Sequence, residues 1–170
     1  LAMEPITNFI SDFIPFFRRY KNALFEIRTK SINNAIFRKH DALTNCIVAY
    51  SLMPEILAQK LDKKAPSLSA RIKNMKYIVK KGWKVGLRFD PLIYCNNWKA
   101  EYAELFASIF KEIKNENIHS ISLGPLRFPK GFFNKLLQFY PKAEEFSFLR
   151  SNERGVVSYE QTLENEMNEY

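Results

Sequence analysis

Apolar and polar residues alternate along several short stretches of the chain, and most of these stretches are followed by a segment with helical spacing. The clearest alternation lies within residues 82–91. A period of two predicts a buried strand here, with Gly82 closing the preceding helix and Pro91 stopping the ladder. Alternating or apolar runs predict further strands at 24–30, 44–51, 120–125 and 145–149.

Between these strands, apolar residues recur every three or four positions, which is typical of amphipathic helices. The spacing predicts helices over 5–17, 32–39, a segment opening at 54, 68–79, 98–114 and 132–139. Ser31 and Ser67 are the predicted N-caps, and Pro15 is expected to kink or end the first helix. Strands that alternate with helices favour parallel βαβ units, so the predicted fold class is α/β.

Length and composition predict one globular core, because 170 residues that are 46% hydrophobic contain no long Gly/Ser linker. Residues 1–150 are assigned to this α/β unit. Residues 151–170 carry five Glu against one Arg, and we expect them to form a loosely held acidic end. No apolar run approaches the roughly 20 residues of a membrane-spanning helix, so no membrane partner is expected.

The formal net charge of +8 is unevenly distributed along the chain. Residues 1–90 contain 17 Lys or Arg against 7 Asp or Glu, whereas residues 91–170 contain 9 against 11. A basic half of this kind is suited to facing phosphate groups.

Cys46 and Cys95 are two isolated cysteines, and neither belongs to a CxxC or CxxxCxxC motif. With only His40 and His119 as further soft ligands, the sequence builds neither a zinc site nor an iron–sulfur site. Cys46 is predicted to be a buried small hydrophobe, whereas Cys95 is either a reactive thiol or an inert one. The histidines fall in predicted loops and receive no role. No leader sequence opens the chain, which predicts a cytoplasmic protein with reduced thiols.

Polar residues follow four of the predicted strands, namely Lys30, Ser51, Asp90 and Arg127, and Arg88 precedes Asp90 by two positions. A parallel sheet would bring these residues to one edge, where ligands collect in α/β proteins. Lys30 is suited to a carboxylate or phosphate and Ser51 to an amine or hydroxyl, but either residue could instead cap the following helix. Arg88 and Asp90 either hold a polar ligand or form a pair that secures a loop.

The order of short motifs over residues 1–145 resembles the C-terminal half of spore photoproduct lyase and its relatives among radical S-adenosylmethionine enzymes. The matching motifs are Leu1-Ala2-Met3-Glu4, Ile14-Pro15-Phe16-Phe17, Arg28-Thr29-Lys30, Ser51-Leu52-Met53-Pro54, Gly86-Leu87-Arg88-Phe89-Asp90-Pro91, Trp98 with Tyr102, and Ser122-Leu123-Gly124 followed by Arg127-Phe128.

The resemblance implies a partial (β/α) barrel from an enzyme that repairs thymine dimers in ultraviolet-damaged spore DNA. It implies S-adenosylmethionine and a [4Fe–4S] cluster as cofactors, with Lys30 and Ser51 near the methionine moiety of the former. The family's CxxxCxxC and its hydrogen-returning cysteine precede the matched region, so this chain is not expected to bind the cluster. The family's Ser-x-Asn-Pro is changed to Ser51-Leu52-Met53-Pro54, and no aromatic, basic DNA-binding hairpin is expected after Leu149.

We therefore expect a fragment or subunit of a spore photoproduct lyase-like repair enzyme that is inactive alone. Its cluster-bearing N-terminal half would be encoded separately, or the chain would be a frameshifted fragment or a relic. DNA binding is expected to be weak and non-specific. The alternative is a non-catalytic half-barrel module for interaction with another protein.

Overall fold

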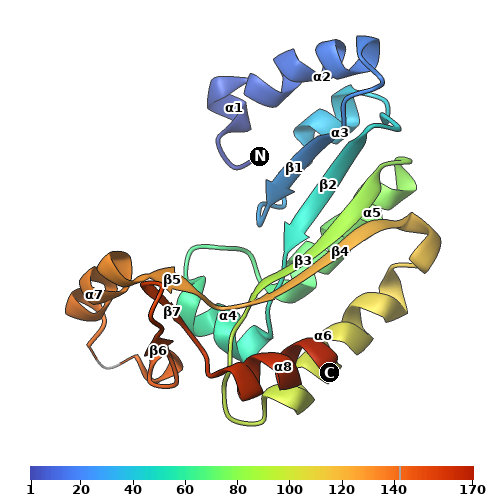
Figure 1. Cartoon of the computed structure of the whole chain (residues 1–170). Coiled ribbons are helices and arrows are strands. Elements are labelled where there is room, and N and C mark those ends of the chain that lie inside the picture. The colour runs from blue at the N-terminus through green and yellow to red at the C-terminus, as the bar shows by residue number, and fades with distance from the viewer. Residues whose placement is uncertain (142) are drawn as a thin grey trace.

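The computed structural model describes residues 1–141 and 143–170, and its main feature is a four-stranded parallel sheet (Figure 1). The strands are β1 (Phe25–Thr29), β2 (Cys46–Ser51), β3 (Lys84–Leu92) and β4 (Ile118–Pro125). They lie in the order β1-β2-β3-β4, with Thr29 opposite Tyr50 and Ser51 opposite Arg88. Because all pairs are parallel, the carboxyl ends of the strands meet at one edge. The predicted α/β fold with a parallel sheet is confirmed.

Helices supply the crossover connections that parallel strands require. They are α3 (Ala35–Lys39), α4 (Glu55–Leu61), α5 (Leu68–Lys80) and α6 (Trp98–Glu112), the last followed by the short 3-10 helix η1 (Asn115–Asn117). Two further helices, α1 (Glu4–Thr7) and α2 (Phe9–Arg19), precede β1. Ser67 caps α5 as predicted, because its hydroxyl accepts a hydrogen bond from the backbone N–H of Ala70 at 3.3 Å. Gly82 lies between α5 and β3 with φ at +86°, a conformation that favours glycine.

The structure excludes one of the two alternatives for Pro15 and contradicts the predicted cap at Ser31. Pro15 does not end the first helix, because α2 continues to Arg19 and buries Ile14 completely. The packing of this face outweighs the one backbone hydrogen bond that a proline removes. Ser31 does not cap a helix either, since its hydroxyl accepts the N–H of Asn33 and α3 begins four residues later.

The edges of two strands also differ from the prediction. The ladder between β3 and β4 shifts register after Phe89 and resumes with Leu92 opposite Pro125, so Pro91 interrupts the strand without ending it. His119 lies inside β4 and not in a loop, and its side chain is exposed.

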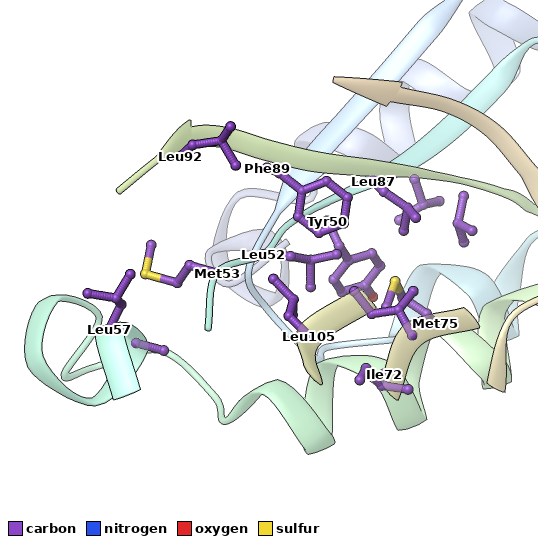
Figure 2. Packing of buried hydrophobic residues seen from close by; sticks show 14 of the residues in the cluster. Tyr50, Leu52, Met53, Leu57, Ile72, Met75, Leu87, Phe89, Leu92 and Leu105 are labelled. Atoms are coloured by element: carbon purple, nitrogen blue, oxygen red, sulfur yellow. The ribbon is translucent and has the colours of Figure 1, made fainter. Parts of the chain in front are cut away.

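The core lies between one face of the sheet and the crossover helices. Figure 2 shows Tyr50, Leu87 and Phe89 projecting from the strands toward Ile72 and Leu105 of the helices. All five side chains are buried. Burial of this apolar face is the main force that fixes the register of the strands.

A second, smaller sheet follows the main one and is antiparallel. Its strands are β5 (Phe128–Pro129), β6 (Arg150–Ser151) and β7 (Val156–Ser158), in the order β5-β7-β6, accompanied by α7 (Lys130–Phe139) and the 3-10 helix η2 (Glu144–Phe146). This unit lies beyond the carboxyl ends of the main strands (Figure 1). The prediction of a strand at 145–149 is wrong, because most of that segment forms η2 and the turn that follows it.

The expectation of a loosely held acidic end is also wrong. Within residues 151–170, β7 is the central strand of the second sheet, and α8 (Gln161–Glu169) lies beside α6 (Figure 1). Tyr159 and Met167 are buried in the core, which anchors this end despite its charge. The division of the chain at residue 150 stays a prediction. No helix among the described residues is long and apolar enough to cross a membrane.

Candidate functional site

The face of the main sheet opposite the core carries charged and hydroxyl side chains. Successive residues of a strand point to opposite faces, so Arg88 and Asp90 of β3 point away from the core that contains Leu87 and Phe89. We call the set Glu26, Arg28, Arg88, Asp90, Ser120 and Ser122 the polar face; it comes from β1, β3 and β4. Ala49 of the intervening strand β2 is small, which lets side chains of β1 and β3 meet across it.

Arg88 is the central residue of the polar face and is only 5% exposed. Its Nε and Nη2 donate to the two carboxylate oxygens of Glu26 at 3.2 and 2.6 Å, and Nη2 also donates to the Ser120 hydroxyl at 2.9 Å. Its Nη1 donates to the backbone oxygens of Leu87 and Ser120. A Cβ on Gly86 would lie 2.9 Å from Arg88 Nη2, so a glycine is needed for the guanidinium to lie close to the sheet.

Asp90 forms a second, more open ion pair on the same face. Its Oδ2 lies 3.5 Å from Arg28 Nη2 and accepts a hydrogen bond from the Ser122 hydroxyl at 3.0 Å. Arg28 and Asp90 are both partly exposed. One interpretation of the sequence had Arg88 and Asp90 pair with each other. The structure shows instead that each pairs with a residue of β1.

Glu26 connects the two ion pairs, since its Oε1 also lies 3.5 Å from Arg28 Nε. The hydrogen bond from Arg88 outweighs the effect of burial and, with the charges of Arg88 and Arg28, holds the pKa of Glu26 below its usual value. Glu26 is thus an anion throughout the neutral range. Sequence analysis overlooked this residue because its partners are distant in the chain.

Lys30 and Ser51 belong to a different network, at the carboxyl ends of β1 and β2. Lys30 Nζ donates to Asp62 Oδ1 at 2.5 Å, and Asp62 Oδ2 accepts from Arg71 Nη2 at 3.2 Å. Arg71 Nη1 donates to the backbone oxygen of Ser51 at 3.0 Å. Two residues absent from the sequence prediction, Asp62 and Arg71, therefore connect the two predicted cofactor-binding residues.

The end of β1 opens into a cleft of about 1560 Å³. It is lined by residues 1–3, 28–32, 59–66, Leu136, Tyr140 and 143–146. Basic side chains outnumber acidic ones in this lining, and Lys30 and Arg28 both contribute to it. The cleft is larger than the roughly 300–1,000 Å³ of a typical small-molecule site, which indicates room for a further wall or a larger ligand.

Arg127 stands apart from both networks. It lies between β4 and β5, is exposed, and has no hydrogen-bond or ion-pair partner among residues 1–141 and 143–170. The sequence placed Lys30, Ser51, Asp90 and Arg127 at one edge. Within the structure, Lys30 and Ser51 share the Arg71 network, whereas Asp90 and Arg127 do not take part in it.

Several motif residues of the family resemblance have structural contacts. Both carboxylate oxygens of Glu4 accept backbone N–H groups at the start of α2, from Ile10 at 3.0 Å and Ser11 at 2.9 Å. Burial would raise the pKa of Glu4, but these hydrogen bonds prevail and lower it. The Tyr102 hydroxyl accepts the N–H of Ile93 at 2.8 Å. Met53, which replaces the family's asparagine, is buried in the core.

The cysteines show no sign of activation. Burial raises the pKa of the Cys46 thiol to about 12. Burial, and then the charge of Glu101, also raise the pKa of Cys95, which favours the inert interpretation of this residue. Within the described part of the chain, no three His, Cys, Asp or Glu side chains are grouped in a way that could hold a metal ion.

A hairpin follows Leu149, and its residues 150–158 contain no aromatic side chain. Strands β6 and β7 are antiparallel, and Asn152 Oδ1 accepts the N–H groups of Arg154 and Val156 at 3.0 Å in the turn between them. Gly155 completes this turn with φ at +73°. Short-range turn chemistry around Asn152 and Gly155 could have indicated this hairpin.

A parallel sheet with crossover helices and a cleft at the carboxyl ends of the strands is the arrangement expected of part of a (β/α) barrel. The family model described as "SPL: Spore photoproduct lyase" matches residues 1–154. The chain therefore belongs to the spore photoproduct lyase family.

Solved structures of spore photoproduct lyase share this fold. One, a mutant with bound AdoMet and dinucleoside spore photoproduct, superimposes with a TM-score of 0.71 at 16% identity. Another, complexed with dinucleoside spore photoproduct, gives 0.68 at 15% identity. Each match covers 86% of this chain but 46% of the other, so the chain spans less than half of the solved proteins. No curated protein sequence matches. The predicted partial barrel and the family are confirmed.

Proposed function

We propose that the chain is the C-terminal part of the barrel of a spore photoproduct lyase-like DNA-repair enzyme, and that it acts only together with a cluster-bearing N-terminal half. The observation that carries the proposal is the family match over residues 1–154. The substrate would be the thymine-dimer photoproduct in DNA, and the chemistry would be radical S-adenosylmethionine chemistry. A cytoplasmic location, expected from the sequence, remains part of this proposal.

S-adenosylmethionine fits the residues at the ends of β1 and β2. Lys30 lines the cleft and its side chain is partly exposed. Ser51 is not among the residues that line the cleft, but its hydroxyl has no hydrogen-bond partner among the described residues. These two groups would bind the carboxylate and a polar group of the methionine moiety. When bound beside a reduced cluster, this cofactor supplies a 5′-deoxyadenosyl radical.

A [4Fe–4S] cluster does not fit the described residues. Cys46 is fully buried inside β2, Cys95 is half-buried, and the pKa of each thiol is raised by burial. Cluster ligation requires several exposed thiolates grouped together. The cluster would therefore be held by the N-terminal half.

The position for that half is the free edge of β1. Among residues 1–141 and 143–170, strand β1 has a neighbour on only one side in the main sheet, so its other edge can accept a further parallel strand. Helix α2 exposes Phe9, Phe13 and Phe16, and its Phe17 stacks on Phe25 of β1. An exposed aromatic row of this kind indicates a surface made to be covered.

Binding of DNA by this part of the barrel would be weak and independent of sequence. The basic cleft lining, exposed Arg127 and the β6–β7 hairpin are the surfaces suited to phosphate. Phosphate contacts give salt-dependent affinity without specificity, and a flipped lesion would need a pocket walled by the other half.

The exposed aromatic row of α2 also favours a second candidate function, a non-catalytic half-barrel module that binds another protein. One experiment separates the two. The chain would be mixed with a separately expressed N-terminal half of a spore photoproduct lyase carrying its cluster, under anaerobic reducing conditions. Release of thymidine from dinucleoside spore photoproduct by the mixture, but by neither part alone, is the expected result. A stable complex without repair would favour the binding module, and no complex would refute both.

A further inference from the structure

A buried arginine connects the two strand ends that carry Lys30 and Ser51. The Arg71 side chain is 2% exposed, and each of its three nitrogens contacts a different group. Nε donates to the backbone oxygen of Pro66 at 2.8 Å, Nη1 to that of Ser51 at 3.0 Å, and Nη2 to Asp62 Oδ2 at 3.2 Å. A buried guanidinium requires a counter-ion, and Asp62 supplies it.

Asp62 is shared between two cations. Its Oδ2 is bound to Arg71 inside the protein, and its Oδ1 is bound to Lys30 at the lining of the cleft. Two cations and one carboxylate leave this cluster with a net charge of +1. Since Lys30 is 38% exposed and Arg71 is buried, the excess positive charge is accessible to a ligand only at Lys30.

We propose that Arg71 is a positioning residue that neutralises Asp62, so that the charge of Lys30 is not fully compensated and can attract an anionic group in the cleft. The identity of that group, the carboxylate of S-adenosylmethionine, rests on the proposed function, whereas the charge balance rests on the contacts alone. Without Arg71, Asp62 would pair with Lys30 only, and the cluster would have no net charge. An incoming carboxylate would then have to compete with Asp62.

The test compares anion binding by the folded full chain and four variants, by NMR titration of the amide signals of residues 29–31. The probes are inorganic phosphate, S-adenosylmethionine and its decarboxylated analogue. R71Q is expected to bind phosphate and S-adenosylmethionine about tenfold more weakly, the scale of one charge-assisted contact. In R71Q/D62N the affinity should return to within about threefold of the wild type, because Lys30 again carries an uncompensated charge. D62N should bind at least as tightly as the wild type.

The double variant distinguishes charge balance from structural support. Both R71Q and R71Q/D62N lose the Arg71 contacts to Pro66 and Ser51, so only the charge balance differs in favour of the double variant. Failure of R71Q/D62N to recover binding would overturn the inference. K76Q is the matched control, since Lys76 lies on the same helix, is exposed and pairs with Glu112. An equal loss in K76Q would also overturn it. If R71Q does not fold, D62N decides, and loss of anion binding there refutes the proposal.

The probes separate this inference from the proposed function. Phosphate binding at residues 29–31 without S-adenosylmethionine binding would support the charge balance and refute the cofactor assignment. Equal affinities for S-adenosylmethionine and its decarboxylated analogue would overturn the carboxylate contact at Lys30. Binding of neither phosphate nor S-adenosylmethionine to the wild type at millimolar concentration would overturn the inference itself.

Discussion

Replacing Glu26 with glutamine would remove the counter-ion of Arg88 while keeping the size of the side chain. In the native protein both Glu26 oxygens accept hydrogen bonds from Arg88, whose side chain is only 6% exposed. The variant E26Q would keep one acceptor oxygen but lose the charge. Asp90 cannot replace it, because it already pairs with Arg28 and Ser122.

The magnitude follows from the burial of the two partners. Removing one partner of a fully buried ion pair costs about 3–5 kcal/mol, whereas exposed pairs contribute about 0–1 kcal/mol. The Glu26 side chain is 34% exposed, so solvent screens part of the interaction. We therefore expect E26Q to lower the free energy of unfolding by about 2 kcal/mol. For a chain of this length, this corresponds to a fall in Tm of about 4–8 °C.

Urea unfolding followed by circular dichroism would measure this loss, first at pH 7 and then at falling pH. The folded-state pKa of Glu26 is lowered by Arg88, so the stabilisation is present above the unfolded-state pKa of about 4.3 and disappears as the pH falls through the folded-state value. The difference between wild type and E26Q should therefore be constant above about pH 5 and vanish in acid.

The matched control for E26Q is E112Q, in which the lost carboxylate is as exposed as that of Glu26 but pairs with Lys76, whose side chain is 48% exposed, whereas that of Arg88 is 6% exposed. This variant should unfold at almost the wild-type urea concentration, because an exposed pair contributes little. A loss for E26Q within about 0.5 kcal/mol, the usual range of surface substitutions, would refute the assigned role of the pair. So would a loss that persists unchanged in strong acid.

Four further predictions concern packing, association and ligands. G86A should destabilise the protein by about 1–2 kcal/mol in urea unfolding, because its Cβ would lie 2.9 Å from Arg88 Nη2, whereas G131A, with no atom within 4 Å, should not. The isolated chain should self-associate in light scattering through the aromatic row of α2, and a cooperative monomer that binds no hydrophobic dye would contradict this. Anaerobic reconstitution should yield no S-adenosylmethionine-reactive [4Fe–4S] cluster by iron and sulfide analysis. Fluorescence anisotropy should give similar affinities for irradiated and intact duplex DNA, and both should fall steeply between about 50 and 200 mM salt. A preference for irradiated DNA at physiological salt would show that the lesion pocket needs no wall from an N-terminal half.

The main sheet was predictable because its signal is local. Alternation around Leu87 and the apolar run ending at Ser51 both reflect burial of one or both strand faces, which a short window of sequence records. Caps such as Ser67 were predictable for the same reason, since the capped N–H lies three residues away. The second sheet was not, because β5 and β6 have two residues each and no periodicity to detect.

The candidate site was predicted only in part, because its contacts join distant positions. Lys30 and Ser51 could be identified by their place after a strand, but their connection through Asp62 and Arg71 depends on where the loop after α4 and the start of α5 lie. Arg71 in particular has the sequence setting of a solvent-exposed helix residue, and only the fold shows that it is buried. A burial pattern constrains which face a residue occupies, and it does not specify a polar partner.

The charge balance of the polar face bears on how a barrel could close over it. Glu26 with Arg88 and Arg28 with Asp90 contribute two positive and two negative charges, so this face carries no net charge. Covering a neutral, internally hydrogen-bonded face costs far less desolvation energy than covering an uncompensated ion. The excess positive charge lies instead in the cleft at the end of β1, where Lys30 is accessible. The structure thus separates a face that other strands can cover from an edge that remains suited to an anionic ligand.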